Sequence, residues 1–181
     1  MEAEIISSEY INQHQYFTAR KDAYQLPSGK IVDPYFVVEL PESATAMAIT
    51  EDNQVILISQ YRHPVNKYSL ELPGGFVDKL EDPFDAIKRE LLEETGYVFN
   101  DVYHLGTTAA NPGVLNNFTQ LYLATGGKKI KDQQLDANEE IKIILKSLEE
   151  VKEILNQSKI IQSMHALCLF YGIAKLKELK G

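Results

Sequence analysis

The 181-residue sequence has little cysteine and a shortage of positive charge, and each shortage excludes a class of structure or function. Cys168 is the only cysteine, so no disulfide can form within the chain; this fits a reducing compartment, and we expect a cytoplasmic protein. The 18 Lys and Arg are outnumbered by 26 Asp and Glu, which gives a formal net charge of −8. This balance argues against binding to a nucleic acid, which needs clustered positive side chains.

Long apolar runs are also missing. No stretch approaches about 18 uninterrupted apolar residues, so no membrane span is expected. Residues 1–10 have neither a basic start nor an apolar centre, and they predict no signal peptide. The length and the ordinary hydrophobic content of 44% indicate one globular domain, or one domain with a small appendage.

The most informative stretch runs from Gly75 to Tyr97 and contains signals for the start and the end of a helix. Asp82 is a good N-cap, and Pro83 suits the first helical position because its missing N–H would be unpaired there anyway. Gly96 can take the left-handed conformation that closes a helix. These signals predict a helix over residues 83–95.

This helix carries a group of carboxylates on one side. Within about one third of its circumference lie Glu90, Glu93 and Glu94. An adjoining stripe is apolar and is expected to pack on a core: Phe84, Ile87 and Leu91. Like charges on neighbouring turns repel one another, so a divalent cation among them is one explanation, and an ordinary solvated acidic face is the alternative. Arg89 is one turn before Glu93 and is expected to pair with it and with Glu81, holding the carboxylates in place.

The same positions resemble the Nudix box, a motif of the Nudix hydrolase superfamily. Its fixed positions match at Gly75, Glu81, Arg89-Glu90-Leu91, Glu93-Glu94 and Gly96, while Tyr97 stands where the family more often has an aliphatic residue. The resemblance is closest to the branch that hydrolyses ADP-ribose and other nucleoside diphosphate sugars. In that branch Gln-x-Arg followed by Glu-Leu-Pro-x-Gly is common, as at residues 60–62 and 71–75 here.

The resemblance implies an α+β fold: a Nudix α/β/α sandwich with a central mixed β-sheet between helices, plus a small N-terminal antiparallel β-sheet. We expect an N-terminal β-sheet region over residues 1–42, which in this branch commonly joins two subunits into a homodimer, and a Nudix domain over residues 43–181. The residues themselves agree, since residues 1–40 show strand-like segments separated by turn material such as Asp33-Pro34.

Further elements are predicted from local patterns. Ala44–Thr50 and Val55–Tyr61 suggest a hairpin whose second strand is almost continuously apolar and therefore central. Gly126–Asp132 is expected to be a polar turn. Ser147 and Glu150 form a capping-box pattern at the start of a helix, and a last helix is expected over about residues 160–178.

The resemblance also implies a metal site and an activated water. Mg²⁺, with Mn²⁺ as a possible substitute, would be held by Glu90 and Glu94, by Glu93 directly or through water, and by the backbone carbonyl of Gly74. Glu81 and Arg89 would orient these ligands. In related enzymes the general base often comes from a loop outside the box. Here Glu139 and Glu140 are available; we favour Glu139, with Glu93 and a merely solvated loop pair as alternatives.

Candidate substrate-binding residues lie outside the box. Arg62 ends a predicted strand and suits a phosphate clamp, although a surface salt bridge is equally consistent with its position; Glu71 is its companion in the branch motif. Pro112 lies 15 residues past Tyr97, at an offset that marks the ADP-ribose branch, and Asn116 and its neighbour Asn117 are expected to hydrogen-bond substrate. Aromatic side chains able to stack on a base, each by default a strand core residue, are Tyr16, Phe17, Tyr24, Tyr35 and Phe36.

The expected activity is therefore metal-dependent hydrolysis of the pyrophosphate bond of a nucleoside diphosphate sugar, giving a nucleoside monophosphate and a sugar phosphate. Hydrolysis of nucleoside triphosphates or dinucleoside polyphosphates is the alternative enzymatic activity. A non-catalytic sensor of nucleotide sugars is a third hypothesis; such proteins usually lose box carboxylates, and this chain has all of them.

Overall fold

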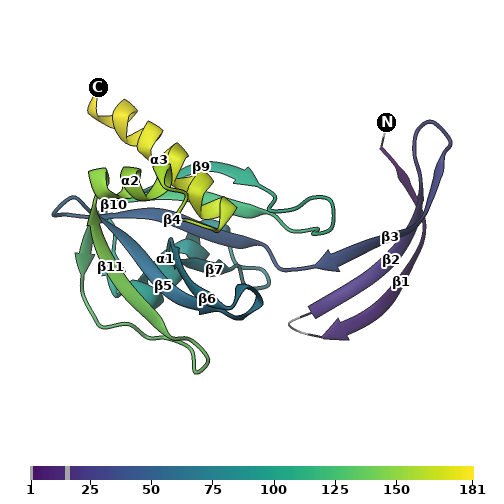
Figure 1. The fold of residues 1–181 in the computed structure, drawn as a ribbon, viewed down its shortest axis with the longest axis horizontal. Coiled ribbons are helices and arrows are strands. Elements are labelled where there is room, and N and C mark those ends of the chain that lie inside the picture. Colours follow the sequence, from purple (N-terminus) through teal and green to yellow (C-terminus); the bar gives the residue numbers. More distant parts are fainter. Residues whose placement is uncertain (1, 15–16) are drawn as a thin grey trace. The chain divides into compact units, whose positions relative to one another are not determined.

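The computed structural model describes residues 2–14 and 17–181, in two compact units that we treat separately. The smaller unit comprises the chain up to Pro41 together with Ala109–Phe118, and the larger comprises Glu42–Thr108 and Thr119–Gly181 (Figure 1). Tyr16, one of the aromatic candidates, lies outside the described residues. No helix in the described part of the chain is long and apolar enough to span a membrane.

The smaller unit is a three-stranded antiparallel sheet, as predicted. Its strands, in the order β1-β2-β3, are β1 (Glu4–His14), β2 (Phe17–Gln25) and β3 (Ile31–Glu39). The prediction of a turn at Asp33-Pro34 is wrong, because both residues lie within β3. They fall at a register irregularity of an edge strand, where a proline is tolerated since its missing N–H breaks no ladder hydrogen bond.

The loop of residues 109–118 belongs to the smaller unit because it is hydrogen-bonded to β3 and to the residues that follow it. The Tyr35 hydroxyl donates to the carbonyl of Gly113 at 2.7 Å. The backbone N–H of Val38 donates to the carbonyl of Val114 at 2.8 Å. The loop is therefore held against the C-terminal half of β3, from Tyr35 onward.

The larger unit is built on a mixed sheet, as the resemblance implied. Its strands are β4 (Ser43–Thr50), β5 (Gln54–Arg62), β6 (Lys67–Glu71), β7 (Gly74–Phe76), β8 (Tyr97–Val98), β9 (Asp101–Thr108), β10 (Thr119–Lys129) and β11 (Ile141–Ser147). The main order is β11-β5-β4-β10-β8, and β6, β7 and β9 pair with β5, β4 and β10. The β4–β10 pair is parallel and the other pairs are antiparallel. The apolar strand β5 lies between two neighbours, which confirms its predicted central position.

The polar turn predicted at Gly126–Asp132 is wrong in its first half, because β10 continues to Lys129. Gly127 pairs with Thr50 of β4, and Lys128 pairs with Val98 of β8. A Cβ atom at Gly127 would lie 2.5 Å from the ring of Phe99, so glycine here permits a close approach of the chain rather than a turn.

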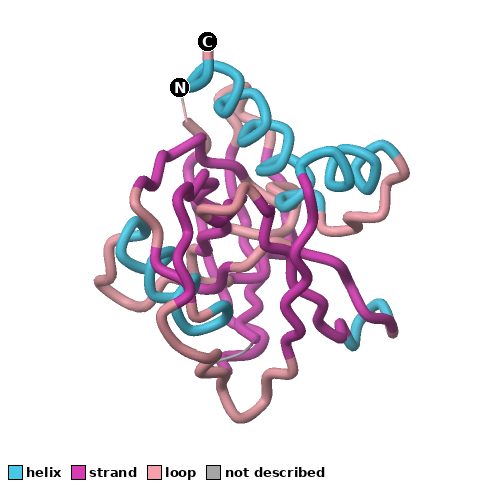
Figure 2. Tube along the Cα trace, turned by 90° about the vertical axis from the view of Figure 1, so that its left-hand side faces the viewer, coloured by secondary structure: helices cyan, strands magenta, loops and turns pink. Residues whose placement is uncertain are grey.

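In the described part of the chain, three α-helices cover the two faces of the sheet: α1 (Pro83–Thr95), α2 (Leu148–Asn156) and α3 (Ser163–Lys180). A short 3-10 helix, η1 (His63–Val65), follows β5. Figure 2 shows them in cyan around the magenta strands. The predicted helix over residues 83–95 is confirmed, as are the capping box at Ser147 and the last helix, which begins three residues later than expected.

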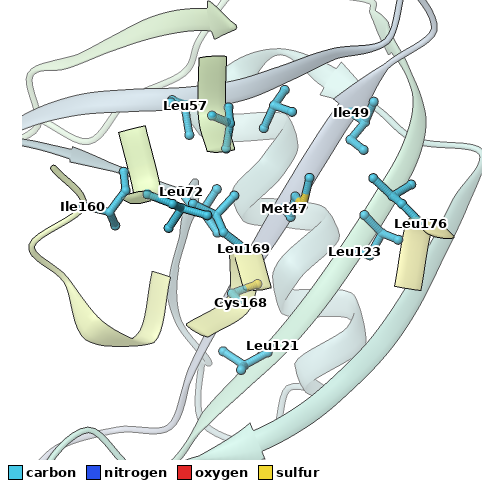
Figure 3. Close-up of a cluster of buried hydrophobic side chains, with 13 residues drawn as sticks. Met47, Ile49, Leu57, Leu72, Leu121, Leu123, Ile160, Cys168, Leu169 and Leu176 are labelled. Carbon is cyan, nitrogen blue, oxygen red and sulfur yellow. The ribbon is translucent and has the colours of Figure 1, made fainter. Parts of the chain in front are cut away.

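The two cores lie on opposite sides of β4, whose side chains alternate in size. Met47 and Ile49 belong to the core under α2 and α3, together with Leu169 and Cys168 (Figure 3). On the other face β4 presents only alanines to α1, namely Ala44, Ala46 and Ala48. Small side chains let a helix approach its sheet closely, and α1 buries Ile87 and Leu91 there. Phe84, also predicted for this stripe, is 37% exposed.

Candidate active site

The residues at the two ends of α1 cap the helix as predicted from the sequence. The side chain of Asp82 accepts a hydrogen bond of 2.8 Å from the backbone N–H of Phe84, and Pro83 occupies the first helical turn. Gly96 closes the helix at φ 77°, and a Cβ atom there would lie 2.1 Å from the carbonyl oxygen of Lys131. Both the conformation and the close approach therefore require glycine, and the helix direction is fixed at each end.

The glycine turn before α1 brings the backbone against both β4 and the helix. Gly74 has φ 145°, and a Cβ atom on it would lie 2.2 Å from the carbonyl oxygen of Ala44. A Cβ atom on Gly75 would lie 2.5 Å from Oε1 of Glu90. Any larger residue at either position would displace β4 or the Glu90 carboxylate, so the two glycines set the distance between turn and helix.

Glu94 is the most buried of the α1 carboxylates in the site, with 5% of the residue exposed. Its Oε2 accepts a hydrogen bond of 2.8 Å from the backbone N–H of Gly74. Burial raises the pKa of Glu94 to about 8; the Gly74 N–H opposes this shift, and the negative charges of Glu90 and Glu139 add to it. A carboxyl with this pKa is largely protonated at pH 7, and a cation bound beside it would favour the ionised form.

Arg89 joins the other carboxylates. Its Nε and Nη2 donate to the two oxygens of Glu81, each at 2.9 Å. Its Nη1 donates to Oε1 of Glu90 at 2.8 Å and to Oε2 of Glu93 at 3.1 Å. The predicted contacts with Glu93 and Glu81 are therefore present, and the contact with Glu90 is an addition. These hydrogen bonds, together with one from the Asp78 N–H, lower the pKa of Glu81 to about 2.

The chemistry of the donors fits a divalent cation, although the arrangement is not a closed ligand set. No group of three His, Cys, Asp or Glu side chains among the described residues converges on one point. The reason is that Arg89 engages Glu90 and Glu93, while Glu94 faces the Gly74 N–H. Burial raises the pKa of Glu90 against the opposing effect of Arg89, and Glu93 and Glu139 raise it further. Carboxylate oxygens such as those of Glu90 and Glu94 are the donors that Mg²⁺ prefers.

Arg62 forms a bidentate ion pair with Glu71. Its Nε and Nη2 lie 2.9 and 2.7 Å from the two Glu71 oxygens. The Glu71 side chain is only 3% exposed, whereas that of Arg62 is 46% exposed. The pKa of Arg62 is raised first by the Glu71 hydrogen bonds and further by the charges of Glu94 and Glu139. The guanidinium therefore lies within electrostatic reach of the carboxylates of α1 and keeps an exposed edge.

The loop that carries Glu139 is fastened to the C-terminal end of α1. The backbone N–H of Gln134 donates to the Glu93 carbonyl at 2.8 Å. The side chain of Gln133 donates to the Glu94 carbonyl at 2.6 Å and to the Ile141 carbonyl at 3.2 Å. These bonds satisfy carbonyls that a helix end leaves unpaired. They place the loop beside the metal-ligand candidates, and sequence reasoning missed Gln133.

Glu139 is held within its own loop. Its Oε2 accepts a hydrogen bond of 3.2 Å from the backbone N–H of Asp136, and its N–H donates to the Asp136 carbonyl at 2.9 Å. Its charge contributes to the raised pKa values of Glu90 and Glu94. Glu140, the alternative base, lines a surface cavity of about 650 Å³ with Gln133.

His165, expected to be a packed or surface histidine, is a packed one with two polar neighbours. Its Nδ1 accepts a hydrogen bond of 3.2 Å from the backbone N–H of Leu72, and it lies 3.8 Å from Oε2 of Glu71. Sequence reasoning gave this residue no role in the site. No local pattern signals it, because its partners are far away in the chain.

Pro112 and Asn116 belong to the smaller unit, and their roles stay predictions. The Oδ1 of Asn116 accepts a hydrogen bond of 3.1 Å from the Leu40 N–H. Asn117 donates from Nδ2 to the Pro41 carbonyl at 3.0 Å. Both amides therefore hold the loop in this structure. Among the aromatic candidates in the described part, Tyr24 packs edge-on against Tyr35, while Phe17 and Phe36 are more than half exposed.

Comparison with known families and proteins agrees with this geometry. Residues 39–165 match the model of the NUDIX domain, and residues 4–38 match that of the nucleoside diphosphate sugar hydrolase N-terminal domain. The chain is 31% identical to a methanol dehydrogenase activator of Bacillus methanolicus, over 94% of this chain and 92% of that protein. It is 25% identical to an ADP-ribose pyrophosphatase of Bacillus subtilis, over 98% of this chain and 95% of that protein.

A solved structure has the same fold. The crystal structure of an ADP compounds hydrolase superimposes with a TM-score of 0.86, covering 99% of this chain and 96% of that one at 21% identity. At this identity the similarity concerns the fold, including the N-terminal sheet and the mixed sheet with three helices.

Proposed function

The chain belongs to the NUDIX domain family, and from that premise we propose that it hydrolyses the pyrophosphate bond of ADP-ribose or a related nucleoside diphosphate sugar. The products are a nucleoside monophosphate and a sugar phosphate. The observation that carries the proposal is the contact of the glycine turn with α1, where Gly74 bonds Glu94 and Gly75 lies against Glu90. These contacts bring the glycine turn against two carboxylates of α1 and support the proposed ligand set.

The substrate class is supported by the rest of the chain. The N-terminal residues 4–38 match a domain named for nucleoside diphosphate sugar hydrolases. The ADP-ribose pyrophosphatase of Bacillus subtilis is similar along nearly the whole chain. Both favour a diphosphate joined to a sugar over the alternative substrates, nucleoside triphosphates and dinucleoside polyphosphates.

Magnesium would be held by Glu90, Glu94 and the carbonyl of Gly74, with Glu93 as a direct or water-mediated ligand. When bound, it would neutralise charge on the diphosphate and favour in-line attack by water. The net charge of −8 makes such neutralisation necessary for an anionic substrate.

The chain's own side chains have separate tasks. Arg89 and Glu81 orient the ligand carboxylates through the hydrogen bonds described above. Arg62, held by Glu71, presents its exposed guanidinium edge to a phosphate. Glu139 takes the proton from the attacking water, after leaving the N–H of Asp136.

A homodimer joined through the N-terminal sheet is part of the proposal. Large apolar side chains of the smaller unit are more than half exposed: Ile5, Ile6, Ile11, Phe17, Ile31 and Phe36. They lie on or beside the three strands of the small sheet, and exposed apolar side chains in this number favour an interaction site there. We also place the protein in the cytoplasm, where the buried thiol of Cys168 stays reduced.

A second candidate function follows from the similarity to the methanol dehydrogenase activator. In this reading the same hydrolysis would regulate a partner dehydrogenase. Addition of the purified chain to a methanol dehydrogenase tests it, with the Glu94→Gln variant alongside. Activation by wild type alone would link the effect to hydrolysis.

The primary test is a substrate panel. Purified protein is incubated with Mg²⁺ and either nucleoside diphosphate sugars, nucleoside triphosphates or dinucleoside polyphosphates, and phosphomonoesters are detected by phosphate release with a coupled phosphatase. The proposal predicts release from nucleoside diphosphate sugars, ADP-ribose among them. Turnover confined to triphosphates or dinucleoside polyphosphates would replace it with the alternative.

A further inference from the structure

We propose that His165 on α3 is a positioning residue that fixes the Leu72–Gly74 segment, and through it the Gly74 carbonyl and the Glu94 carboxylate. The inference deepens the proposed function, because that function requires these two groups to meet at one place. His165 itself lies outside the Nudix box and in the last helix of the chain.

Each residue of the segment is hydrogen-bonded to a different element. The N–H of Leu72 donates to Nδ1 of His165 on α3 at 3.2 Å. The carbonyl of Pro73 accepts from Oγ1 of Thr45 and from the N–H of Ala46, both on β4 and both at 3.1 Å. The N–H of Gly74 donates to Glu94 on α1. The segment is thus held at three successive points, and His165 supplies the first.

The Leu72 N–H depends on His165 because the strand ladder stops one residue earlier. Strand β6 ends at Glu71, which pairs with Ile58 of β5. Leu72 is fully buried, so its N–H has no access to water. A buried donor without an acceptor costs about 1–3 kcal/mol. Loss of the acceptor would therefore favour movement of the segment toward another partner.

His165 accepts this hydrogen bond only with an unprotonated Nδ1, which places the proton of the neutral ring on Nε2. Burial lowers the pKa of His165 to about 4; the nearby Glu71 carboxylate opposes this shift and Arg62 adds to it. The ring therefore stays neutral near pH 7, and its Nε2–H tautomer offers Nδ1 as the acceptor.

The same imidazole ring also lies close to the Arg62–Glu71 ion pair. Its Nδ1 lies 3.8 Å from Oε2 of Glu71, the oxygen that binds Nη2 of Arg62. Helix α3 thus supports both the glycine turn and the buried carboxylate that holds the guanidinium. A single side chain couples the metal-ligand candidates to the phosphate-clamp candidate.

Two variants distinguish the effect of losing the hydrogen-bond acceptor from the effect of changing how the side chain packs. His165→Asn keeps an acceptor near the position of Nδ1, whereas His165→Leu keeps the bulk and removes the acceptor. The readouts are hydrogen exchange of the Leu72 and Gly74 amides and Mn²⁺ affinity by calorimetry, neither of which needs a substrate. The leucine variant is expected to exchange faster at both amides and to bind Mn²⁺ about 10–100-fold more weakly, with the asparagine variant close to wild type.

If the His165→Leu variant folds and has the same amide exchange rates and the same Mn²⁺ affinity as wild type, the inference is wrong. If that variant does not fold, the ¹⁵N spectrum of wild-type His165 decides: the Nε2–H tautomer with an accepting Nδ1 is required, and the Nδ1–H tautomer excludes the contact. Because these readouts need no turnover, a failed substrate panel would reject the proposed function and leave them interpretable.

Discussion

The carboxylate of Glu94 and the backbone N–H of Gly74 are hydrogen-bonded at 2.8 Å across 20 residues of sequence. This bond connects the helix that carries the candidate ligands to the turn whose carbonyl is another candidate. It also keeps the buried carboxyl in one orientation. Because burial raises the pKa of Glu94 to about 8, this group is largely protonated at pH 7, and a bound cation would favour its ionised form. The pair therefore fixes the position of one candidate ligand relative to the glycine turn.

Arg89→Lys is expected to weaken Mn²⁺ binding and turnover. Lysine keeps the charge but cannot donate at once to Glu81, Glu90 and Glu93, so the carboxylates lose their common anchor. Loss of such an orienting partner costs about 10–100-fold in metal affinity or activity. Calorimetric titration with Mn²⁺ measures the effect, and Lys88→Arg, one residue earlier, is the matched control. Equal affinity in Arg89→Lys and wild type would remove the orienting role.

Glu139→Gln is expected to lower turnover while leaving metal affinity nearly unchanged. A general base contributes about 10²–10⁴-fold to the rate. Glutamine can still accept from the Asp136 N–H, so the loop should keep its conformation. Steady-state kinetics with ADP-ribose measure the loss, and Glu140→Gln is the neighbouring control. If Glu139→Gln turns over normally, the base is Glu140 or Glu93 instead.

The stability of the fold should depend on the protonation of His165. Its pKa is about 4 when folded, below the ordinary value of 6.5. As the pH falls below the unfolded value, the unfolded chain binds the proton first, so stability decreases until the folded pKa is reached. The loss between about pH 7.5 and about pH 5 amounts to about 2 kcal/mol.

Urea unfolding of wild type and His165→Asn at the two pH values isolates this contribution, because the other titrating groups are common to both. The difference between the two proteins should change by that amount across the interval. A constant difference would show that His165 has an ordinary pKa in the folded protein.

Charge on the exposed face of the N-terminal sheet should separate the proposed dimer. The double variant Ile11→Glu, Phe36→Glu places two carboxylates among apolar side chains that are more than half exposed. Light scattering after size exclusion should give twice the chain mass of 20.5 kDa for wild type and the chain mass for the variant. Leu179→Glu, an exposed apolar position of the larger unit, should stay dimeric. A monomeric wild type would reject this interface.

Local patterns in the sequence were sufficient for α1 and for two of the partners of Arg89, Glu81 and Glu93. The caps Asp82 and Gly96 act within a few residues of the helix they bound, so their effect is readable from spacing alone. The contact of Arg89 with Glu93 joins residues four apart on α1, a separation that helix geometry fixes. The hairpin of β4 and β5 follows in the same way from its apolar pattern.

The positions that sequence reasoning missed are bonded over long separations. His165 meets Leu72 across 93 residues, and Gln133 meets the Glu94 carbonyl across 39. No periodicity or cap motif carries such a pairing, because it depends on how α3 and the loop of residues 130–140 pack on the sheet. The two incorrect predictions of turns have a related cause. Pro34 and Gly126 are residue types that favour turns, and strand pairing overrides that local preference.

The central claim is best tested by ³¹P NMR of ADP-ribose with Mg²⁺ and either wild type or Glu94→Gln. Glutamine can still accept from the Gly74 N–H, so the fold should be preserved while a carboxylate ligand is lost. We expect the diphosphate resonances to give way to two phosphomonoesters with wild type, and more than about 100-fold more slowly with the variant, since a metal contributes several kcal/mol. Equal rates for the two folded proteins would contradict the account.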